Sequence, residues 1–134
     1  MEYLDTTDHQ FGFKKKHSTE LCVYAVKEVI NFYRSKGSNV FICLLDAKKA
    51  FDRVNHWTLF KVLHDRKVPN FIIKLLSYWY CNQTFCVKWG SETSGSFYVS
   101  NGVPQGSILS PFLFNVYFNI FSITLCKSNI GCYI

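Results

Sequence analysis

Asp46 is the residue whose position most directly suggests chemistry. It follows an apolar run at residues 40–45, and a carboxylate at the end of a buried strand is costly to bury unless a cation or several donors meet it. Magnesium prefers oxygen ligands of this kind and keeps substrate phosphates in its shell. From this residue alone, an Asp that caps the next turn is the commoner interpretation, so metal binding stays one of two hypotheses.

A basic run and a glycine-containing loop are the other candidates. Lys14, Lys15 and Lys16 could contact phosphates, although such a run is often only a solvated loop. In the loop at residues 101–107, Gly106 lets the backbone approach a ligand closely, and the Gln105 amide both donates and accepts hydrogen bonds. The alternative for this loop is a plain turn before a helix that tolerates proline at its first position.

Three segments, taken together, resemble the motifs of one enzyme family. Residues 10–19 read QFGFKKKHST, residues 45–56 read LDAKKAFDRVNH, and residues 101–111 read NGVPQGSILSP. In this order and at these separations they closely resemble the fingers motif, the first catalytic motif and the next palm motif of non-LTR (LINE-type) retrotransposon reverse transcriptases. The resemblance extends from residue 10 to the end of the chain.

The resemblance gives the middle motif specific roles. Asp46 would be the first magnesium-binding carboxylate, and the carbonyl of Ala47 could add a ligand. Phe51 would lie under the sugar of the incoming nucleotide, where its ring leaves no room for a 2′-hydroxyl; core packing is its alternative or additional role. Three further residues of this motif are expected to hold the turn after the strand: Asp52, Asn55 and His56.

The other two motifs would supply nucleotide and nucleic-acid contacts. Lys14 stands where the family usually has Arg, and it would contact the triphosphate without the bidentate grip of a guanidinium. Lys15 and Lys16 would contact nucleic acid. Gln105 and Gly106 would flank the nucleotide and the template base.

The reaction implied by the resemblance is the addition of deoxynucleotides to a DNA primer on an RNA template, with two magnesium ions about 3.5–4 Å apart. The second carboxylate cluster, an aromatic-x-Asp-Asp motif, is expected shortly after Gly131, and the sequence ends at Ile134. Residues 117–120, YFNI, fall in a predicted helix and lack both carboxylates. We therefore expect at most one weak magnesium site and no polymerisation by this chain alone. The alternative is a catalytically dead nucleic-acid-binding module.

Composition narrows the partners and the compartment. Lys and Arg outnumber Asp and Glu by 15 to 9, and the net charge of +6 favours a polyanionic partner. A polar N-terminus without a signal peptide, and six cysteines without zinc-ligand spacing, suggest an intracellular location, in the nucleus or the cytoplasm. Residues 108–126 are mostly apolar but contain several polar residues, so a buried helix is favoured over a membrane span. A small membrane protein anchored by this segment is our third hypothesis. The sequence does not indicate an oligomeric state.

Four helices are predicted to hold these residues. The first follows a cap at Ser18 or Thr19 and ends at Gly37. The others are predicted over residues 57–67, from residue 70 onward, and over residues 110–125. In the third helix, five residues are predicted to face inward: Phe71, Ile72, Leu75, Leu76 and Trp79.

Strands complete an α+β pattern. Residues 40–45 predict a strand buried on both faces, and residues 85–89 and 97–99 predict a hairpin around a turn at residues 91–95. The expected fold is a partial polymerase palm and fingers, with helices packed on one face of a small antiparallel sheet. Residues 11–134 would form this partial reverse-transcriptase domain after a poorly ordered segment at residues 1–10. The open edge of the strand at residues 40–45 predicts a marginal or aggregation-prone product.

Overall fold

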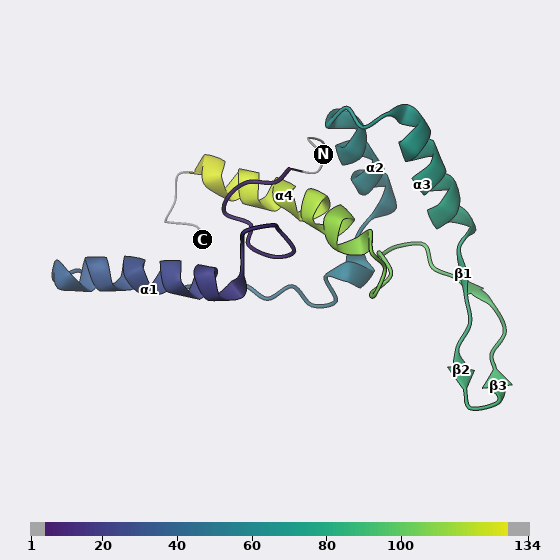
Figure 1. Ribbon diagram of the computed structural model, residues 1–134, viewed down its shortest axis with the longest axis horizontal. Coiled ribbons are helices and arrows are strands. Elements are labelled where there is room, and N and C mark those ends of the chain that lie inside the picture. The colour runs from purple at the N-terminus through teal and green to yellow at the C-terminus, as the bar shows by residue number, and fades with distance from the viewer. Residues whose placement is uncertain (1–4, 129–134) are drawn as a thin grey trace. The chain divides into compact units, whose positions relative to one another are not determined.

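The computed structural model describes residues 5–128 of the chain. In these residues four α-helices, one short 3-10 helix and two two-stranded antiparallel sheets confirm the α+β class (Figure 1). The predicted loose segment at residues 1–10 lies partly outside the described residues. The stretch after Gly131, where the second carboxylate motif was expected to follow, lies wholly outside them.

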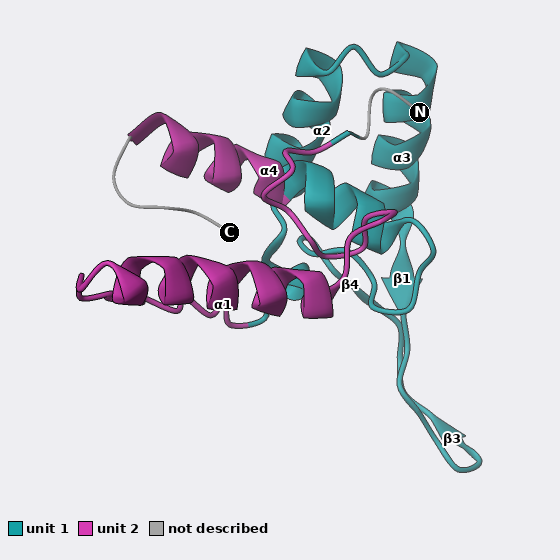
Figure 2. Ribbon diagram, turned by 60° about the vertical axis from the view of Figure 1, so that its left-hand side comes forward, with its two compact units in different colours: residues 1–5, 49–117 teal, residues 6–48, 118–134 magenta. Residues whose placement is uncertain are grey.

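The chain divides into two compact units (Figure 2). Unit 1 comprises residues 1–5 and 49–117, and unit 2 comprises residues 6–48 and 118–134. Helix α4 (Ser110–Ser128) begins in unit 1 and ends in unit 2. Consequently, the three motifs are divided as well: the basic run and Asp46 belong to unit 2, and the loop at residues 101–107 belongs to unit 1.

Helices α2 and α3 pack together and form the centre of unit 1. Helix α2 (His56–Asp65) begins where the Asn55 Oδ1 accepts a hydrogen bond from the Thr58 N–H at 3.0 Å, and α3 (Asn70–Asn82) begins directly after Pro69. Both helices were predicted, and the starts follow from a side-chain cap and a helix breaker. The buried core residues of this unit are Val54, Leu59, Leu63, Val68, Leu76, Tyr80, Val103, Leu113 and Val116.

The inward face of α3 was predicted only in part. Leu76 is buried as expected, but Phe71, Leu75 and Trp79 are exposed, and Tyr80 is buried in their place. Most residues of this helix are apolar or aromatic, so spacing alone does not single out the stripe that meets α2.

The predicted hairpin is present in unit 1. Strand β1 (Thr84–Phe85) pairs with β4 (Phe97–Tyr98), and β2 (Lys88–Trp89) pairs with β3 (Glu92–Thr93). Gly90, with φ +60°, makes the turn, so the turn is earlier and tighter than predicted. Figure 1 shows the hairpin extending away from α2 and α3. Its side chains are exposed except at the base, where Phe85 is half-buried.

Unit 2 contains α1 (Thr19–Ser35), as predicted. The Ser18 Oγ accepts a hydrogen bond from the Leu21 N–H at 3.1 Å at its start, and Gly37 adopts φ +76° just past its end. The cap and the glycine stop therefore match the sequence prediction. None of the residues of α1 is buried, so its apolar stripe is half-exposed or exposed throughout.

The predicted buried strand at residues 40–45 is wrong. These residues have no regular secondary structure, and the side chains of Phe41 and Leu44 are 93% and 90% exposed. A strand exists only where a neighbouring strand takes up its backbone hydrogen bonds. Among residues 5–128 no segment pairs with this run, so it forms no strand despite its apolar composition.

Candidate nucleotide-binding site

Asp46 lies in the open segment of unit 2. Because the strand is absent, the carboxylate does not sit at the end of a buried element, and both Asp46 and Ala47 are exposed. Among the described residues, no group of three or more His, Cys, Asp or Glu side chains converges to hold a metal ion. The described side chains therefore do not fit a two-magnesium site, and the candidate ligands in this segment are one carboxylate, that of Asp46, and the Ala47 carbonyl.

Lys14 is engaged with its own neighbourhood in unit 2. Its Nζ donates to the carbonyl oxygens of Thr6 and Thr7 at 3.0 Å each and lies 3.2 Å from the Asp8 carboxylate. The Thr7 N–H in turn donates to the buried Asn119 Oδ1 at 2.9 Å. Lys14 therefore helps to fold the segment before it against the second half of α4, and a triphosphate would have to compete with these acceptors.

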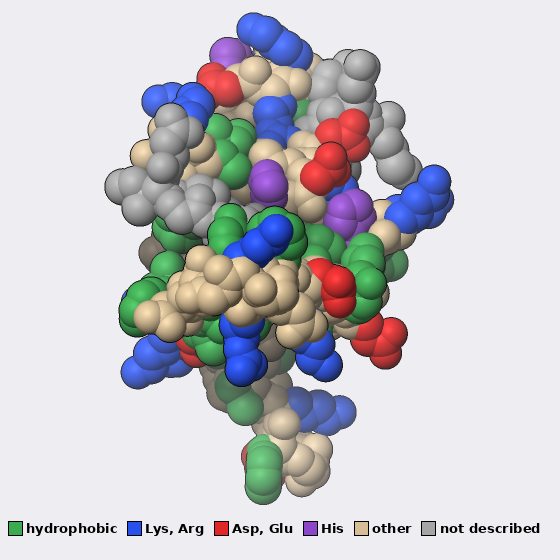
Figure 3. All heavy atoms as spheres, turned by 90° about the vertical axis from the view of Figure 1, so that its left-hand side faces the viewer, with side chains coloured by type: hydrophobic (Ala, Val, Ile, Leu, Met, Phe, Trp, Pro, Cys, Tyr) green, Lys and Arg blue, Asp and Glu red, His purple; other side chains and the backbone are tan. Residues whose placement is uncertain are grey.

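Lys15 and Lys16 are different, because both side chains are exposed. Lys16 adopts φ +62°, which turns the chain sharply before α1. Figure 3 shows Lys and Arg side chains projecting outward from the surface of the molecule. Exposed lysines of this kind are available to phosphate groups without breaking an internal contact.

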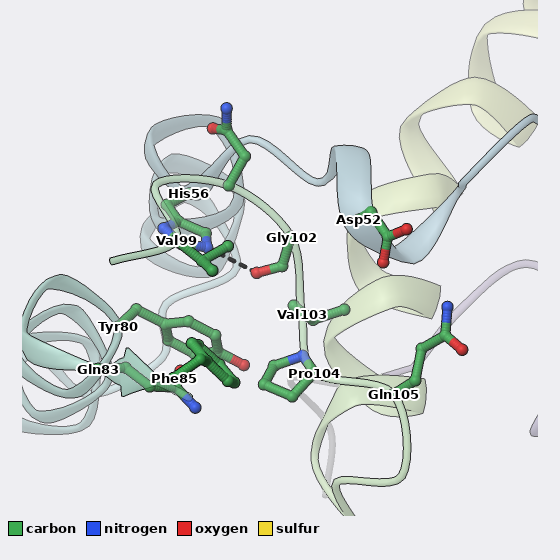
Figure 4. Close-up of a pocket in the computed structure, with 11 residues that line it drawn as sticks. Asp52, His56, Tyr80, Gln83, Phe85, Val99, Gly102, Val103, Pro104 and Gln105 are labelled. Atoms are coloured by element: carbon green, nitrogen blue, oxygen red, sulfur yellow. Dashed lines mark hydrogen bonds between the residues drawn. The ribbon is translucent and has the colours of Figure 1, made fainter. Parts of the chain in front are cut away.

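In unit 1, residues 51–56, the second half of the Asp46 motif, are joined to the loop at residues 101–104 by three hydrogen bonds, one of which Figure 4 shows. The Val103 N–H donates to the Phe51 carbonyl at 2.9 Å, and the Gly102 N–H donates to the Val54 carbonyl at 2.7 Å. The His56 Nε2 lies 2.7 Å from the Gly102 carbonyl oxygen. Residues 51–56, which begin with the 3-10 helix η2 (Phe51–Arg53), therefore bind a loop some fifty residues further along the chain.

A glycine is required at residue 102, where the loop meets the Asp52 backbone. It has φ +92°, which disfavours any residue with a side chain, and an added Cβ would lie 2.8 Å from the Asp52 carbonyl oxygen and 2.9 Å from the Asp52 Cα. Backbone atoms cannot move away as a flexible side chain could. The close approach of the two segments therefore depends on the absence of a side chain at residue 102.

The His56 ring is held among aromatic residues. It is 8% exposed, and its centroid lies 4.9 Å from that of Tyr80 and 6.2 Å from that of Phe60. Burial raises the pKa of the Tyr80 hydroxyl above its ordinary value. The ring of His56 is thus held both by aromatic packing and by its contact with the Gly102 carbonyl.

A cavity of about 320 Å³ lies beside this loop. In the view of Figure 4, His56 and Tyr80 lie on one side of residues 102–104, and Asp52 and Gln105 lie on the other. Gln105 is exposed, and Gly106 follows it with φ +87° and open space around its Cα. The predicted pair is therefore presented on the surface of unit 1 by a loop whose base is buried.

Phe51 has a packing partner in unit 1. Its half-buried ring stacks on that of Phe114 in α4, with centroids 4.5 Å apart and an interplanar angle of 18°. Core packing, one of its two expected roles, is therefore present, and the contact with a sugar stays a prediction. Of the residues expected to hold the turn, Asn55 caps α2, whereas His56 reaches the distant loop.

The importance of His56, Gly102 and Tyr80 to the site was missed from the sequence. The signal for Gly102 was its place in the NGVPQG loop, and the signal for His56 was its place in the LDAKKAFDRVNH motif. Their pairing spans 46 residues and follows from the fold, not from local spacing. Tyr80 carried no signal beyond the apolar pattern of α3.

Comparison with known proteins identifies the family. The family described as "Reverse transcriptase (RNA-dependent DNA polymerase)" matches residues 4–134. The "Probable RNA-directed DNA polymerase from transposon X-element" of Drosophila melanogaster is 37% identical over 116 residues, which are 84% of this chain and 12% of that protein. The chain therefore belongs to the reverse transcriptase family, as its three motifs indicated.

Two further relatives are named after mobile elements. The "RNA-directed DNA polymerase from mobile element jockey" of Drosophila funebris is 31% identical over 81% of this chain and 12% of its own length. The "Retrovirus-related Pol polyprotein from type-1 retrotransposable element R2" of Popillia japonica is 32% identical over 70% of this chain and 16% of its own length. The chain thus spans only 12–16% of the length of these relatives.

No helix among residues 5–128 combines the length and the hydropathy that a membrane span needs. This includes α4, which covers most of the apolar stretch at residues 108–126. In the structure, part of α4 is instead buried in the core of unit 1, through Leu113 and Val116.

Proposed function

We propose that this chain is the part of a retrotransposon RNA-directed DNA polymerase that carries the first metal-binding carboxylate and the nucleotide-facing loop. The parent reaction adds deoxynucleotides to a DNA primer on an RNA template. The observation that supports this most is the set of hydrogen bonds between the loop at residues 101–104 and residues 51–56. It holds Phe51 and Gln105, two residues with expected nucleotide contacts, in one unit.

Roles for the individual residues follow from this proposal. Asp46 and the Ala47 carbonyl would hold one magnesium ion weakly, and a bound metal ion would neutralise phosphate charge and activate an attacking hydroxyl. Phe51, Gln105 and Gly106 would face the nucleotide, and Lys14 would do so once released from its contacts at residues 6–8. We further propose that residues 11–134 act as one part of the polymerase domain in the nucleus or the cytoplasm.

Primer extension tests whether the chain polymerises alone. We expect no extension by the 134-residue chain at micromolar concentration with magnesium or manganese. The reason is that the described residues offer one candidate carboxylate, whereas two-metal chemistry needs a converging set. A complete reverse transcriptase serves as the positive control, and robust extension by this chain would overturn the proposal of inactivity.

The metal site at Asp46 has its own test. Manganese added to the chain should broaden NMR signals near residues 46–47, and Asp46→Asn should abolish the broadening. Asp65→Asn, at another exposed carboxylate, is the matched control and should leave it unchanged. Equal broadening in wild type and Asp46→Asn would refute a metal-binding role for this carboxylate.

A second candidate function, nucleic-acid binding without catalysis, is favoured by the exposure of Lys15 and Lys16. If these lysines contact phosphates, the affinity for an RNA–DNA hybrid should fall with salt. Replacing both by Ala should weaken binding and reduce the salt slope by about one for each lysine. The double variant of Lys61 and Lys74, exposed lysines of α2 and α3, is the control. An affinity indifferent to salt would argue against this function.

A further inference from the structure

We infer that His56 is a positioning residue, which holds the nucleotide-facing loop in place through the carbonyl of Gly102. This inference rests on the proposed function, because it concerns the loop that presents Gln105 and Gly106. It assigns to His56 no contact with substrate, only the fixing of the backbone that leads to those two residues.

The chemistry of the contact defines the state of the ring. A carbonyl oxygen only accepts hydrogen bonds, so the His56 Nε2, at 2.7 Å, must carry a proton and donate it. The Gly102 carbonyl is at a buried residue, where loss of its partner would leave an unsatisfied acceptor. The bond therefore constrains both the tautomer of the imidazole and the orientation of the peptide between residues 102 and 103.

The other contacts around Gly102 show why the bond from His56 matters. The N–H groups of Gly102 and Val103 are already taken by the Val54 and Phe51 carbonyls, which hold one side of the segment. The His56 donor holds the carbonyl between them. The next residue, Pro104, has a fixed φ and no N–H, so it cannot anchor the loop by donating a bond of its own. The direction in which the chain reaches Gln105 is thus set by the three bonds before it.

The donor is also held by contacts other than the loop. His56 is the first residue of α2, directly after the Asn55 cap, and its ring packs against Tyr80 and Phe60. The side chain therefore loses little further freedom when it binds the Gly102 carbonyl, which favours a persistent bond.

The unmodified chain gives the first test. An imidazole proton that is buried and hydrogen-bonded exchanges slowly enough to give an NMR signal. We expect such a signal from the Nε2–H of His56, with the Nδ1 unprotonated in the neutral ring. A neutral ring that carries its proton on Nδ1 would overturn the inference, without any need for a variant to fold.

Two variants then separate donation from packing. His56→Phe keeps an aromatic ring without a donor, and His56→Gln keeps a donor without the ring. We expect His56→Phe to accelerate amide hydrogen exchange about tenfold at Val103 and at Ser107, whose N–H bonds the Pro104 carbonyl. His56→Gln should stay within about threefold of wild type. The inference is overturned if both variants are equally damaging, or if His56→Phe changes nothing at Ser107.

Hybrid binding by the same proteins distinguishes this inference from the proposed function. If the loop faces the template, His56→Phe should weaken binding to an RNA–DNA hybrid, and His56→Gln should restore it. If exchange accelerates as expected and hybrid affinity is equal in all three proteins, the positioning role of His56 stands. The role proposed for the loop would then be wrong.

Discussion

Residues 40–47 and residues 51–56 are close in sequence, yet they differ sharply in structure and burial. Residues 51–56 receive a distant loop through three hydrogen bonds and bury Val54 and His56. Residues 40–47, a few positions earlier, have no regular structure and expose Phe41 and Leu44 almost fully. Apolar composition therefore does not decide which region is ordered, since the exposed run is the more apolar of the two.

The difference shows that the conformation of a motif depends on the segments that pack against it. The segment at residues 51–56 meets its partners within unit 1, from α3, the loop and α4. The run at residues 40–45 needs neighbouring strands on its edges, and residues 5–128 supply none. The two halves of the same motif are therefore expected to respond differently to substitution.

The largest expected difference between the two regions is the loss of unfolding free energy when a leucine is replaced by alanine. Leu59→Ala removes a fully buried side chain of α2 and should cost about 3 kcal/mol of unfolding free energy, because it leaves a cavity in the core. Leu44→Ala, the matched change in the exposed run, should cost less than about 0.5 kcal/mol. Urea denaturation of both variants measures this, and equal losses would mean that residues 40–45 are buried after all.

Two glycines with similar backbone angles provide the next test. Gly102→Ala should lower the unfolding free energy by about 2 kcal/mol, because the added Cβ meets the Asp52 backbone at a positive φ. Gly106→Ala has the same conformational strain in open space and should cost only about 1 kcal/mol. If the two variants have the same denaturation midpoint, the close approach of the two segments is not present in solution.

Helix caps sharpen the comparison further. Asn55→Ala removes the cap of α2, a helix packed in the core, and should lower global stability by about 1 kcal/mol. Ser18→Ala removes the equivalent cap of α1, which buries no residue. It should therefore reduce helical circular dichroism without shifting the cooperative transition. A shift as large as that of Asn55→Ala would show that α1 is part of the cooperative core.

The smallest expected effect concerns alkaline pH. The pKa of Tyr80 is raised by burial above its ordinary value of 10.0, so the unfolded chain releases this proton first as the pH rises. Stability should therefore be unaffected by this group below about pH 10 and should fall above it. Tyr80→Phe should remove that part of the decline, which thermal melts between pH 8 and 11 would measure. If the stability of Tyr80→Phe declines as much as that of wild type, the alkaline loss of stability comes from other groups.

Local signals predicted much of the fold. Ser18, Gly37 and Pro69 mark helix ends through capping, positive φ and the missing N–H, all of which act within a few residues. The strand at residues 40–45 could not be judged in this way, because a strand depends on partners that lie elsewhere in sequence. The same holds for α3, where near-continuous apolar residues hide the buried stripe.

The site was predicted residue by residue only through resemblance to the family. Asp46 stood out by its place after an apolar run, yet the structure exposes it, and its metal-binding role stays a proposal. Lys14 was expected to contact a triphosphate, and this role stays a proposal; in the structure its Nζ contacts three acceptors at residues 6–8. The bond from His56 to Gly102 joins residues 46 apart, and no periodic pattern encodes such a pairing.

Amide hydrogen exchange on the unmodified chain tests the central contrast most directly. The Gly102 and Val103 N–H groups, bonded to the Val54 and Phe51 carbonyls, should be protected to the level of the α2 core. The amides of residues 41–47 should exchange at nearly the rate of an unstructured peptide. Protection of residues 41–47 equal to that of Gly102 and Val103, or rapid exchange at both places, would contradict the account.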